Sequence, residues 1–78
     1  MQIEIITPDK NLFSGEIKQA NFPGTSGSFE LLNNHAPIIS TLAKGTLKLI
    51  DKEGKILTFE INGGVIELLE NKIIVLAE

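Results

Sequence analysis

The single histidine of this chain is the side chain best suited to proton transfer near neutral pH. His35 follows Asn33-Asn34 and precedes Ala36-Pro37. In serine and cysteine triads a histidine activates a neighbouring nucleophile. The chain has no cysteine, and no serine stands at a spacing that suggests a triad. We therefore interpret His35 as a loop residue that hydrogen-bonds within its own connection or meets a neighbour, and we predict no catalytic residue.

A glycine-flanked tetrapeptide and two carboxylates are further candidates for chemistry. Gly24-Thr25-Ser26-Gly27 has too few residues between its glycines for a phosphate-binding P-loop, and no Lys-Ser/Thr pair follows it. A nucleic-acid-binding GxxG loop would sit between helices on a basic surface. The tetrapeptide is instead typical of a turn with unusual backbone angles or of an exposed contact loop. Glu60 and Glu67 occupy outward strand positions, so we interpret them as a solvated face rather than an acid/base pair.

A lysine at an expected hairpin tip suggests a different chemistry. Ile50-Asp51-Lys52-Glu53 stands near the middle of the chain. Lipoyl and biotinyl carrier domains are flattened β-sandwiches of similar length that present a modified lysine after an aspartate at such a tip, and this segment resembles them. Lysine-bearing turns are also common on protein surfaces. A carrier domain acting through Lys52 is therefore kept as the alternative function.

Composition excludes several classes of site. The chain has 78 residues, and a domain of this size buries only about 60% of the surface of its unfolded chain. Without cysteine it can form neither disulfides nor thiolate metal sites, and one histidine cannot anchor zinc without several converging carboxylates. We expect no metal and no cofactor. Contact with a partner is the remaining source of added stability.

Charge and hydropathy also restrict the partners. Seven basic residues, all lysine, are interleaved with ten acidic ones, giving a net charge of -3. This pattern argues against nucleic-acid binding, because no basic patch or guanidinium fork is available. No apolar run reaches the roughly 20 residues that a membrane-spanning helix needs, and the N-terminus lacks the layout of a signal peptide. We expect a cytosolic or stromal compartment.

The pattern of apolar residues predicts strands rather than helices. Short β-branched segments alternate with turn residues, which is typical of an all-β fold: a two-sheet antiparallel β-sandwich or flattened barrel of about 8–10 short strands. A bulge or bend is expected at Ser14-Gly15. The expected strands cover Gln2 to Thr7, Leu12 to Phe22, Pro37 to Leu42, Thr46 to Ile50, Leu57 to Ile61, Val65 to Leu69 and Ile73 to Leu76.

One segment is predicted to be a long surface connection. Asn21 to Ile38 contains two prolines, two glycines, paired asparagines and the histidine, but no nucleophile, metal-ligand cluster or arginine. Long connections without their own secondary structure in a compact domain are usually functional. We therefore expect this segment to dock another protein rather than to catalyse a reaction.

Several short motifs follow one another in an order and spacing that are specific together. They are Ile5-Ile6-Thr7-Pro8, Leu12-Phe13-Ser14-Gly15-Glu16-Ile17, Pro23-Gly24 with Gly27 and Phe29, Leu32, Asn34-His35-Ala36-Pro37-Ile38, Gly45 with Leu47, Gly63-Gly64 with Glu67, and Val75-Leu76-Ala77-Glu78. In this order the chain resembles, nearly end to end, the N-terminal β-sandwich domain of the epsilon subunit of rotary F-type ATP synthases, called delta in mitochondria.

The resemblance implies a non-catalytic subunit of the central stalk, which couples proton-driven rotation to ATP synthesis by docking on the gamma subunit and the c ring. It implies no small-molecule substrate. By position, it assigns the c-ring contact to Thr25, Ser26, Gly27 and Ser28. By position, it assigns the gamma contact to Thr7, His35, Ala36, Pro37, Ile38 and Ser40.

The resemblance also carries expectations about domains and location. Residues 1–78 correspond to the β-sandwich domain, and we expect the two-helix C-terminal domain of many family members to be absent, so neither inhibition nor ATP binding is carried over. The protein is expected at the cytoplasmic face of a bacterial membrane, or the stromal face of a thylakoid, as a peripheral part of the complex. A free-standing binder of carbohydrate or peptide is a third possibility, although the chain lacks the Trp and Tyr that usually stack on sugars.

Overall fold

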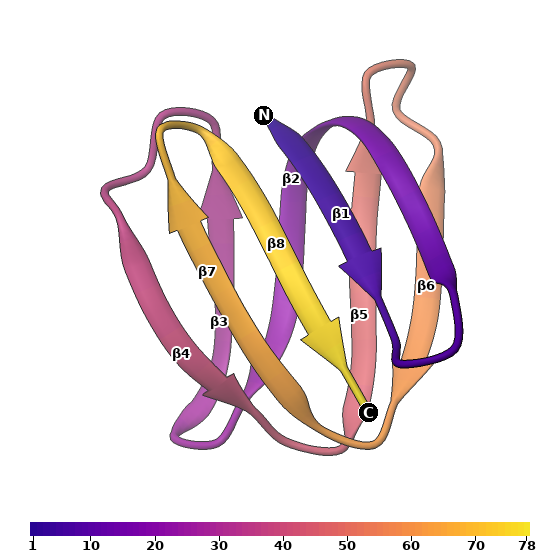
Figure 1. The fold of residues 1–78 in the computed structure, drawn as a ribbon. Coiled ribbons are helices and arrows are strands. Elements are labelled where there is room, and N and C mark those ends of the chain that lie inside the picture. Colours follow the sequence, from indigo (N-terminus) through magenta and orange to yellow (C-terminus); the bar gives the residue numbers. More distant parts are fainter.

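A computed structural model describes residues 1–78 and shows an all-β domain of eight strands (Figure 1). This confirms the predicted fold class. The structure contains no helix long and apolar enough to span a bilayer. The strands are β1 (Gln2–Ile6), β2 (Asn11–Gly24), β3 (Gly27–Leu32), β4 (Ile38–Leu42), β5 (Gly45–Asp51), β6 (Ile56–Ile61), β7 (Gly64–Leu69) and β8 (Lys72–Ala77).

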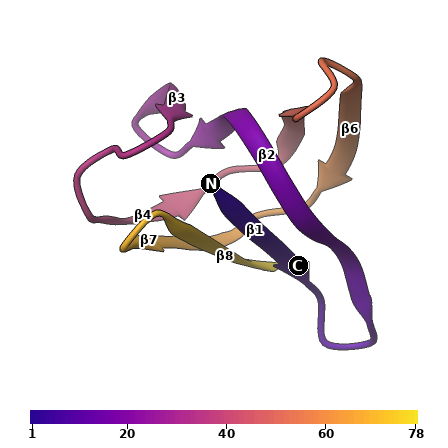
Figure 2. The ribbon, with the colours of Figure 1, turned by 90° about the horizontal axis from the view of Figure 1, so that it is seen from above.

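The strands form two layers that share β2. One layer has the order β4-β7-β8-β1, and the other has β3-β2-β5-β6. The first part of β2 pairs with β1, as in Ile5 opposite Phe13, whereas its second part pairs with β5, as in Ala20 opposite Leu49. Figure 2 shows β2 crossing from one layer to the other. The same strand therefore encloses the core from both sides.

The predicted bend of β2 is present but lies elsewhere. We expected it at Ser14-Gly15, yet both residues pair regularly with β1. The register with β1 shifts between Ile5 and Ile6, which stand opposite Phe13 and Asn11, and the register with β5 shifts between Ile17 and Gln19. At the second shift β2 changes its partner from β1 to β5 and passes between the layers, so neither irregularity falls at Ser14-Gly15.

One strand pair departs from the antiparallel expectation. β1 and β8 run parallel, with Ile3 opposite Ile73 and Ile5 opposite Val75. Parallel neighbours cannot be joined by a short hairpin. In this domain the rest of the chain separates the two strands, so the parallel pair brings the N-terminal and C-terminal strands side by side.

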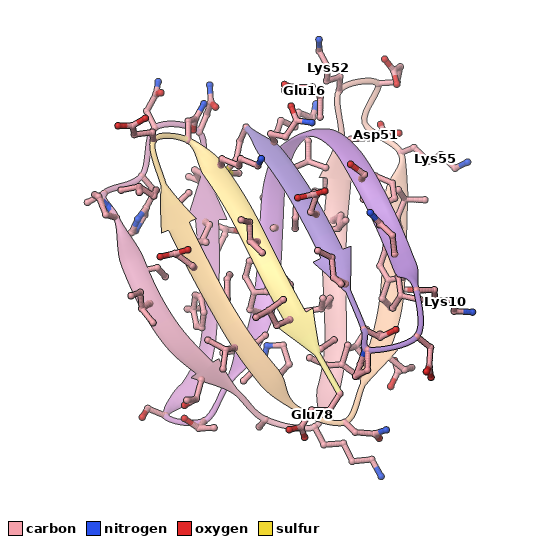
Figure 3. The ribbon with its side chains drawn as sticks, in the orientation of Figure 1. Lys10, Glu16, Asp51, Lys52, Lys55 and Glu78 are labelled. Atoms are coloured by element: carbon pink, nitrogen blue, oxygen red, sulfur yellow. The ribbon has the colours of Figure 1, made fainter.

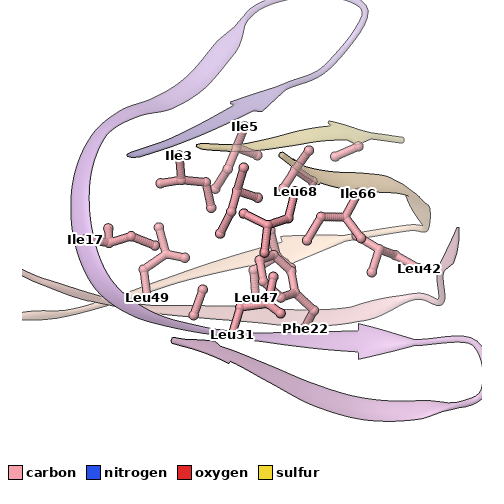
Figure 4. Packing of buried hydrophobic residues seen from close by; sticks show 14 of the residues in the cluster. Ile3, Ile5, Ile17, Phe22, Leu31, Leu42, Leu47, Leu49, Ile66 and Leu68 are labelled. Atoms are coloured by element: carbon pink, nitrogen blue, oxygen red, sulfur yellow. The ribbon is translucent and has the colours of Figure 1, made fainter. Parts of the chain in front are cut away.

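The core is entirely apolar. Alternation along β1 and β5 places Ile3, Ile5, Leu47 and Leu49 inward with no exposed area. Each such residue contributes about 1.5–3 kcal/mol when fully buried. Figure 4 shows these side chains meeting between the layers. The buried cluster comprises Met1, Ile3, Ile5, Ile17, Ala20, Phe22, Leu31, Leu42, Leu47, Leu49, Ile61, Ile66, Leu68, Ile73, Val75 and Ala77.

The prediction of a long connection from Asn21 to Ile38 is wrong. β2 continues to Gly24, a two-residue turn follows, and β3 returns to Leu32, so only a short connection to β4 remains. Prolines and glycines suggested a break in the strand, but Pro23 remains in the ladder opposite Ser28, and its carbonyl accepts a hydrogen bond from the Ala43 amide at 2.7 Å. A proline is tolerated in a strand where its nitrogen is not needed as a donor.

Gly64 occupies a position that no other residue should fill without cost. Its φ is +149°, and an added Cβ would lie 2.3 Å from the Leu76 carbonyl oxygen of the paired strand. Gly54, in the β5–β6 turn, has φ +87°, and its added Cβ would meet only the Lys18 Nζ, at 4.0 Å. A substitution at Gly64 therefore combines a steric clash with backbone strain, whereas a substitution at Gly54 introduces backbone strain alone.

We expect Gly64→Ala to lower the free energy of unfolding by about 2 kcal/mol or more, because strain and a backbone clash combine. Gly54→Ala should cost about 1–2 kcal/mol, from strain alone. Urea denaturation followed by circular dichroism measures both. Equal losses in the two variants would contradict the close approach of Gly64 to β8.

Candidate interaction surfaces

The predicted c-ring segment forms a tight turn at one end of the molecule. Gly24 and Gly27 face each other in the ladder, Thr25 and Ser26 make the turn, and Gly27 has φ +125° as expected for a special backbone angle. Thr25 is fixed to β4, because its amide donates to the Thr41 carbonyl at 3.2 Å and the two threonine hydroxyls lie 2.7 Å apart. The turn is therefore exposed but anchored, at the lower end of Figure 1.

His35 lies in the short connection between β3 and β4, at the opposite end of the molecule (Figure 1). Its amide donates to the Leu32 carbonyl at 3.2 Å, and its Nδ1 lies 2.7 Å from the Ala36 carbonyl oxygen. These contacts tie the histidine to its own connection, as the sequence indicated. The ring is hydrogen-bonded to backbone and not to a nucleophile.

Asn71 holds this end of the molecule together. It stands with Glu70 in the two-residue turn between β7 and β8, where both residues have positive φ, as a type I′ hairpin requires. Its Oδ1 accepts from the Asn34 amide at 2.8 Å, its Nδ2 donates to Asn33 Oδ1 at 2.8 Å, and its carbonyl accepts from the Gln2 amide at 3.1 Å. One turn residue thus fixes the histidine connection.

A groove separates β3 from β4. β3 pairs with β2, and β4 pairs with β7 and meets β2 at one position only, so the facing edges of β3 and β4 share no ladder. A cavity of about 370 Å³ opens there. Ile38 and Ser40 of β4, two of the predicted gamma contacts, line it together with His35 and Phe29.

Thr7 does not join the other predicted gamma contacts. It lies in the connection between β1 and β2, where its hydroxyl bonds the Lys10 carbonyl at 3.1 Å and its amide donates to the same oxygen at 2.8 Å. This connection is at the lower end in Figure 1, whereas the β3–β4 connection, which contains His35, starts at the upper end. The gamma set, which also includes Ala36 and Pro37, is thus spread along the β4 side and over both ends.

The aspartate that precedes Lys52 has a structural role in the turn. Asp51 Oδ1 accepts hydrogen bonds from the Glu53 amide at 2.9 Å and the Lys55 amide at 2.8 Å. Lys52 is exposed at the tip (Figure 3). The aspartate before the lysine is therefore the acceptor that closes the turn.

The remaining candidates for chemistry do not assemble into a site. Glu60 is exposed on β6 and Glu67 is exposed on β7, in different layers, which confirms their outward positions. The Gly24 to Gly27 segment joins two strands and opens no helix. No group of three or more His, Asp or Glu side chains is placed to hold a metal ion.

One exposed apolar surface was not predicted from the sequence. The outer face of the β4-β7-β8-β1 layer exposes Ile39, Val65, Leu69 and Leu76. The available signal was that β7 and β8 carry apolar residues at both inward and outward positions, a pattern typical of strands that are covered on both faces.

Comparison with known sequences matches the whole chain to the family that its motifs resemble. The family model described as ATP synthase, Delta/Epsilon chain, beta-sandwich domain matches residues 1–78. An ATP synthase epsilon chain from Desulfatibacillum aliphaticivorans is 42% identical over 76 residues, which cover 97% of this chain and 54% of the relative. One from Chlorobaculum tepidum is 41% identical over 76 residues, covering 97% and 86%. The chain thus spans about half the length of the first relative and most of the second.

Solved structures share the fold. A chain of the Euglena gracilis mitochondrial ATP synthase, from an OSCP/F1/c-ring structure, superposes with a TM-score of 0.90 at 18% identity, over 96% of this chain and 48% of that one. A chain of the Tetrahymena thermophila mitochondrial ATP synthase central stalk and c ring gives 0.81 at 17% identity, over 99% and 62%. At these identities the likeness concerns the fold alone.

We expect Asn71→Gly to release the histidine connection without unfolding the domain. Glycine keeps the positive φ of the turn, but the bonds to Asn33 and Asn34 are lost. Amide hydrogen exchange should accelerate at Asn34, with a loss of about 1 kcal/mol or less in unfolding free energy. Glu70→Gly, in the same turn, is the control and should leave Asn34 protected. Unchanged exchange at Asn34 in the Asn71 variant would contradict its anchoring role.

Proposed function

The chain belongs to the ATP synthase delta/epsilon chain β-sandwich family, and from this premise we propose that it is a non-catalytic central-stalk subunit of an F-type ATP synthase. The observation that carries the proposal is the family match over residues 1–78, supported by epsilon-chain relatives at 42% and 41% identity. In this role it joins the gamma subunit to the c ring, so that proton-driven rotation reaches the catalytic head.

The placement of the surfaces supports two contacts. The turn of Thr25, Ser26, Gly27 and Ser28 projects from one end and meets the c ring. The β4 side, with His35, Ala36, Pro37, Ile38 and Ser40, meets gamma, and Thr7 contributes from the lower end. The first region is hydrogen-bonded to β4 through Thr25, and the second is hydrogen-bonded through Asn34 to Asn71 in the β7–β8 turn. Such anchoring suits surfaces that must hold their shape under load.

The mechanical part of the role depends on rigidity. Two layers of strands enclose an apolar core, and no buried side-chain polar atom lacks a partner. Close-packed interiors have low compressibility and transmit strain. A sandwich of this kind passes force from one contact to the other without local unfolding, so the subunit acts by position rather than by chemistry.

ATP synthases are membrane-associated complexes, and the family match supports membership in one. We propose that it is peripheral, held through the c ring, on the cytoplasmic face of a bacterial membrane or the stromal face of a thylakoid. Its acidic net charge of -3 does not favour direct binding to anionic lipid, so the attachment runs through protein contacts.

The carrier-domain alternative has less support. Asp51 closes the turn through the Glu53 and Lys55 amides, which accounts for the residue pair that suggested a carrier. The family match and the epsilon-chain relatives favour the stalk subunit. Intact mass discriminates the two, because a lipoyl or biotinyl group on Lys52 adds mass.

We expect an affinity tag on this protein, expressed in its native cell, to recover the gamma subunit and the c ring in gentle detergent. Intact mass spectrometry of the recovered protein should show unmodified Lys52. A tagged Lys52→Ala variant is the control and should recover the same partners. Absence of both partners, or an acyl cofactor on Lys52, would contradict the stalk role.

A bulky residue in the exposed turn should weaken c-ring contact without disturbing the fold. Ser26→Trp adds a large side chain without touching the strained position, and we expect about a tenfold or greater loss of c-ring binding. Glu53→Trp, in the β5–β6 turn at the other end, is the matched control. Binding to detergent-solubilised c ring is measured beside circular dichroism of each variant. Equal binding by both variants would argue against this contact.

A further inference from the structure

The connection between β6 and β7 contains a dipeptide that can react with itself. Asn62 is followed by Gly63, and no other asparagine of the chain precedes a glycine. The backbone nitrogen after an asparagine can reach the side-chain carbon Cγ and close a five-membered ring, which is one reason why asparagine is a thermolabile residue. A following glycine hinders this attack least, because it has no Cβ and adopts the widest range of backbone angles.

The structure exposes the asparagine and leaves the attacking nitrogen unpaired. Asn62 is exposed, whereas Gly63 is buried and has φ +135°. Gly63 lies between the two strands, and its amide donates to no backbone carbonyl. Nearly all buried backbone amides in proteins are hydrogen-bonded, so this nitrogen is an exception. It can attack Asn62 Cγ without first breaking a backbone hydrogen bond.

The paired asparagines of the histidine connection provide a contrast. The amide after Asn33 belongs to Asn34 and donates to Asn71 Oδ1 at 2.8 Å. The amide after Asn34 belongs to His35 and donates to the Leu32 carbonyl at 3.2 Å. Attack by either nitrogen would first cost a hydrogen bond, and each of these residues also carries a side chain that crowds the ring. Asn62 therefore differs from them in both sequence and structure.

We propose that Asn62-Gly63 is a site of spontaneous covalent modification, at which the folded chain converts Asn62 to isoaspartate and aspartate. The Gly63 nitrogen loses its proton and forms a bond to Asn62 Cγ, the bond from Cγ to the side-chain nitrogen breaks, and ammonia leaves. Water then opens the resulting cyclic imide. Cleavage between Cγ and the Gly63 nitrogen gives aspartate, whereas cleavage at the other carbonyl gives isoaspartate. Water is the only co-reactant, and no electrons are transferred.

The modification alters the contact that holds the end of β8. The Asn62 amide donates to the Glu78 carbonyl at 3.1 Å, and the Glu78 amide donates to the Gly63 carbonyl at 2.9 Å. Isoaspartate adds a methylene to the main chain between these two hydrogen bonds, so both cannot keep their geometry. Both products also add a negative charge next to Glu78, which lies at the lower end of Figure 3. The modified connection therefore releases Glu78.

The inference does not depend on the proposed function, because both the reaction and its test concern this chain alone. The β6–β7 connection lies at the lower end of Figure 1, the same end as the turn of Thr25 to Ser28. The added charge and the released chain end therefore appear on the side of the molecule that carries this turn.

The test is incubation of the full chain at neutral pH, folded and in urea, with peptide mapping by mass spectrometry and enzymatic methylation of isoaspartate as the measurements. We expect Asn62 in the folded chain to convert about tenfold or more faster than any other asparagine, and at no less than about a tenth of its rate in urea. Asn62→Gln keeps the amide but requires a larger ring, so conversion at this position should be lost. Asn11→Gln, at another exposed asparagine, is the matched control and should leave conversion of Asn62 unchanged.

Hydrogen exchange tests the structural consequence. Ion exchange separates the modified chain by its extra negative charge, and exchange at the Asn62 and Glu78 amides should then be about tenfold faster in the isoaspartate form than in the fresh chain. A freshly prepared Asn62→Asp variant carries the charge without the longer main chain and should show a smaller increase. Fast conversion at Asn62 with faster exchange at both amides supports the inference. Conversion no faster than at the other asparagines, strong suppression by folding, or unchanged exchange in the isoaspartate form would overturn it.

Discussion

The curvature of β2 is the constraint on which this small fold depends. Its 14 residues pair first with β1 and then with β5 and β3, so one strand contributes to both layers. Two sheets joined only by loops could slide over each other, whereas a shared strand fixes their separation and register. The buried cluster of 16 residues lies within this enclosure. The rings of Phe22, near the end of β2, and Phe29, on β3, have their centroids 5.5 Å apart, so the packing of β2 side chains extends to β3.

An interior without polar groups moves all recognition to the surface. No polar or charged residue is buried, and the histidine, the lysine turn and the carboxylates are exposed or only partly covered. What distinguishes this protein is therefore the shape and position of its exterior. A turn fixed to β4, a histidine connection fixed by Asn71 and an outer sheet face with exposed apolar side chains are distinct parts of that exterior. Such a body can contact two partners at once and keep them at a constant separation.

Most strands could be predicted from the sequence, because alternation is a local property. Ile3 and Ile5, and Leu47 and Leu49, lie at alternate positions of predicted strands and are buried. The hairpin tip at Lys52 and the last two strands, Val65 to Leu69 and Ile73 to Leu76, were also predicted correctly. β3 was missed because Pro23 and two glycines suggested a loop. The special conformation of Gly27 was nevertheless predicted, and the roles of the turn and the histidine connection remain predictions.

The sequence by itself determined the fold class, the inward face of most strands and the residues that can adopt positive φ, because each of these depends on near neighbours in the chain. Only the tertiary structure decided which strands stand side by side. Thr7 and His35 lie at opposite ends, and Glu4, Ile39 and Glu67 share one row, because pairing joins strands far apart in sequence. Alternation of apolar and polar residues indicates that a side chain points outward. Only the pairing of the strands determines which residues lie next to it.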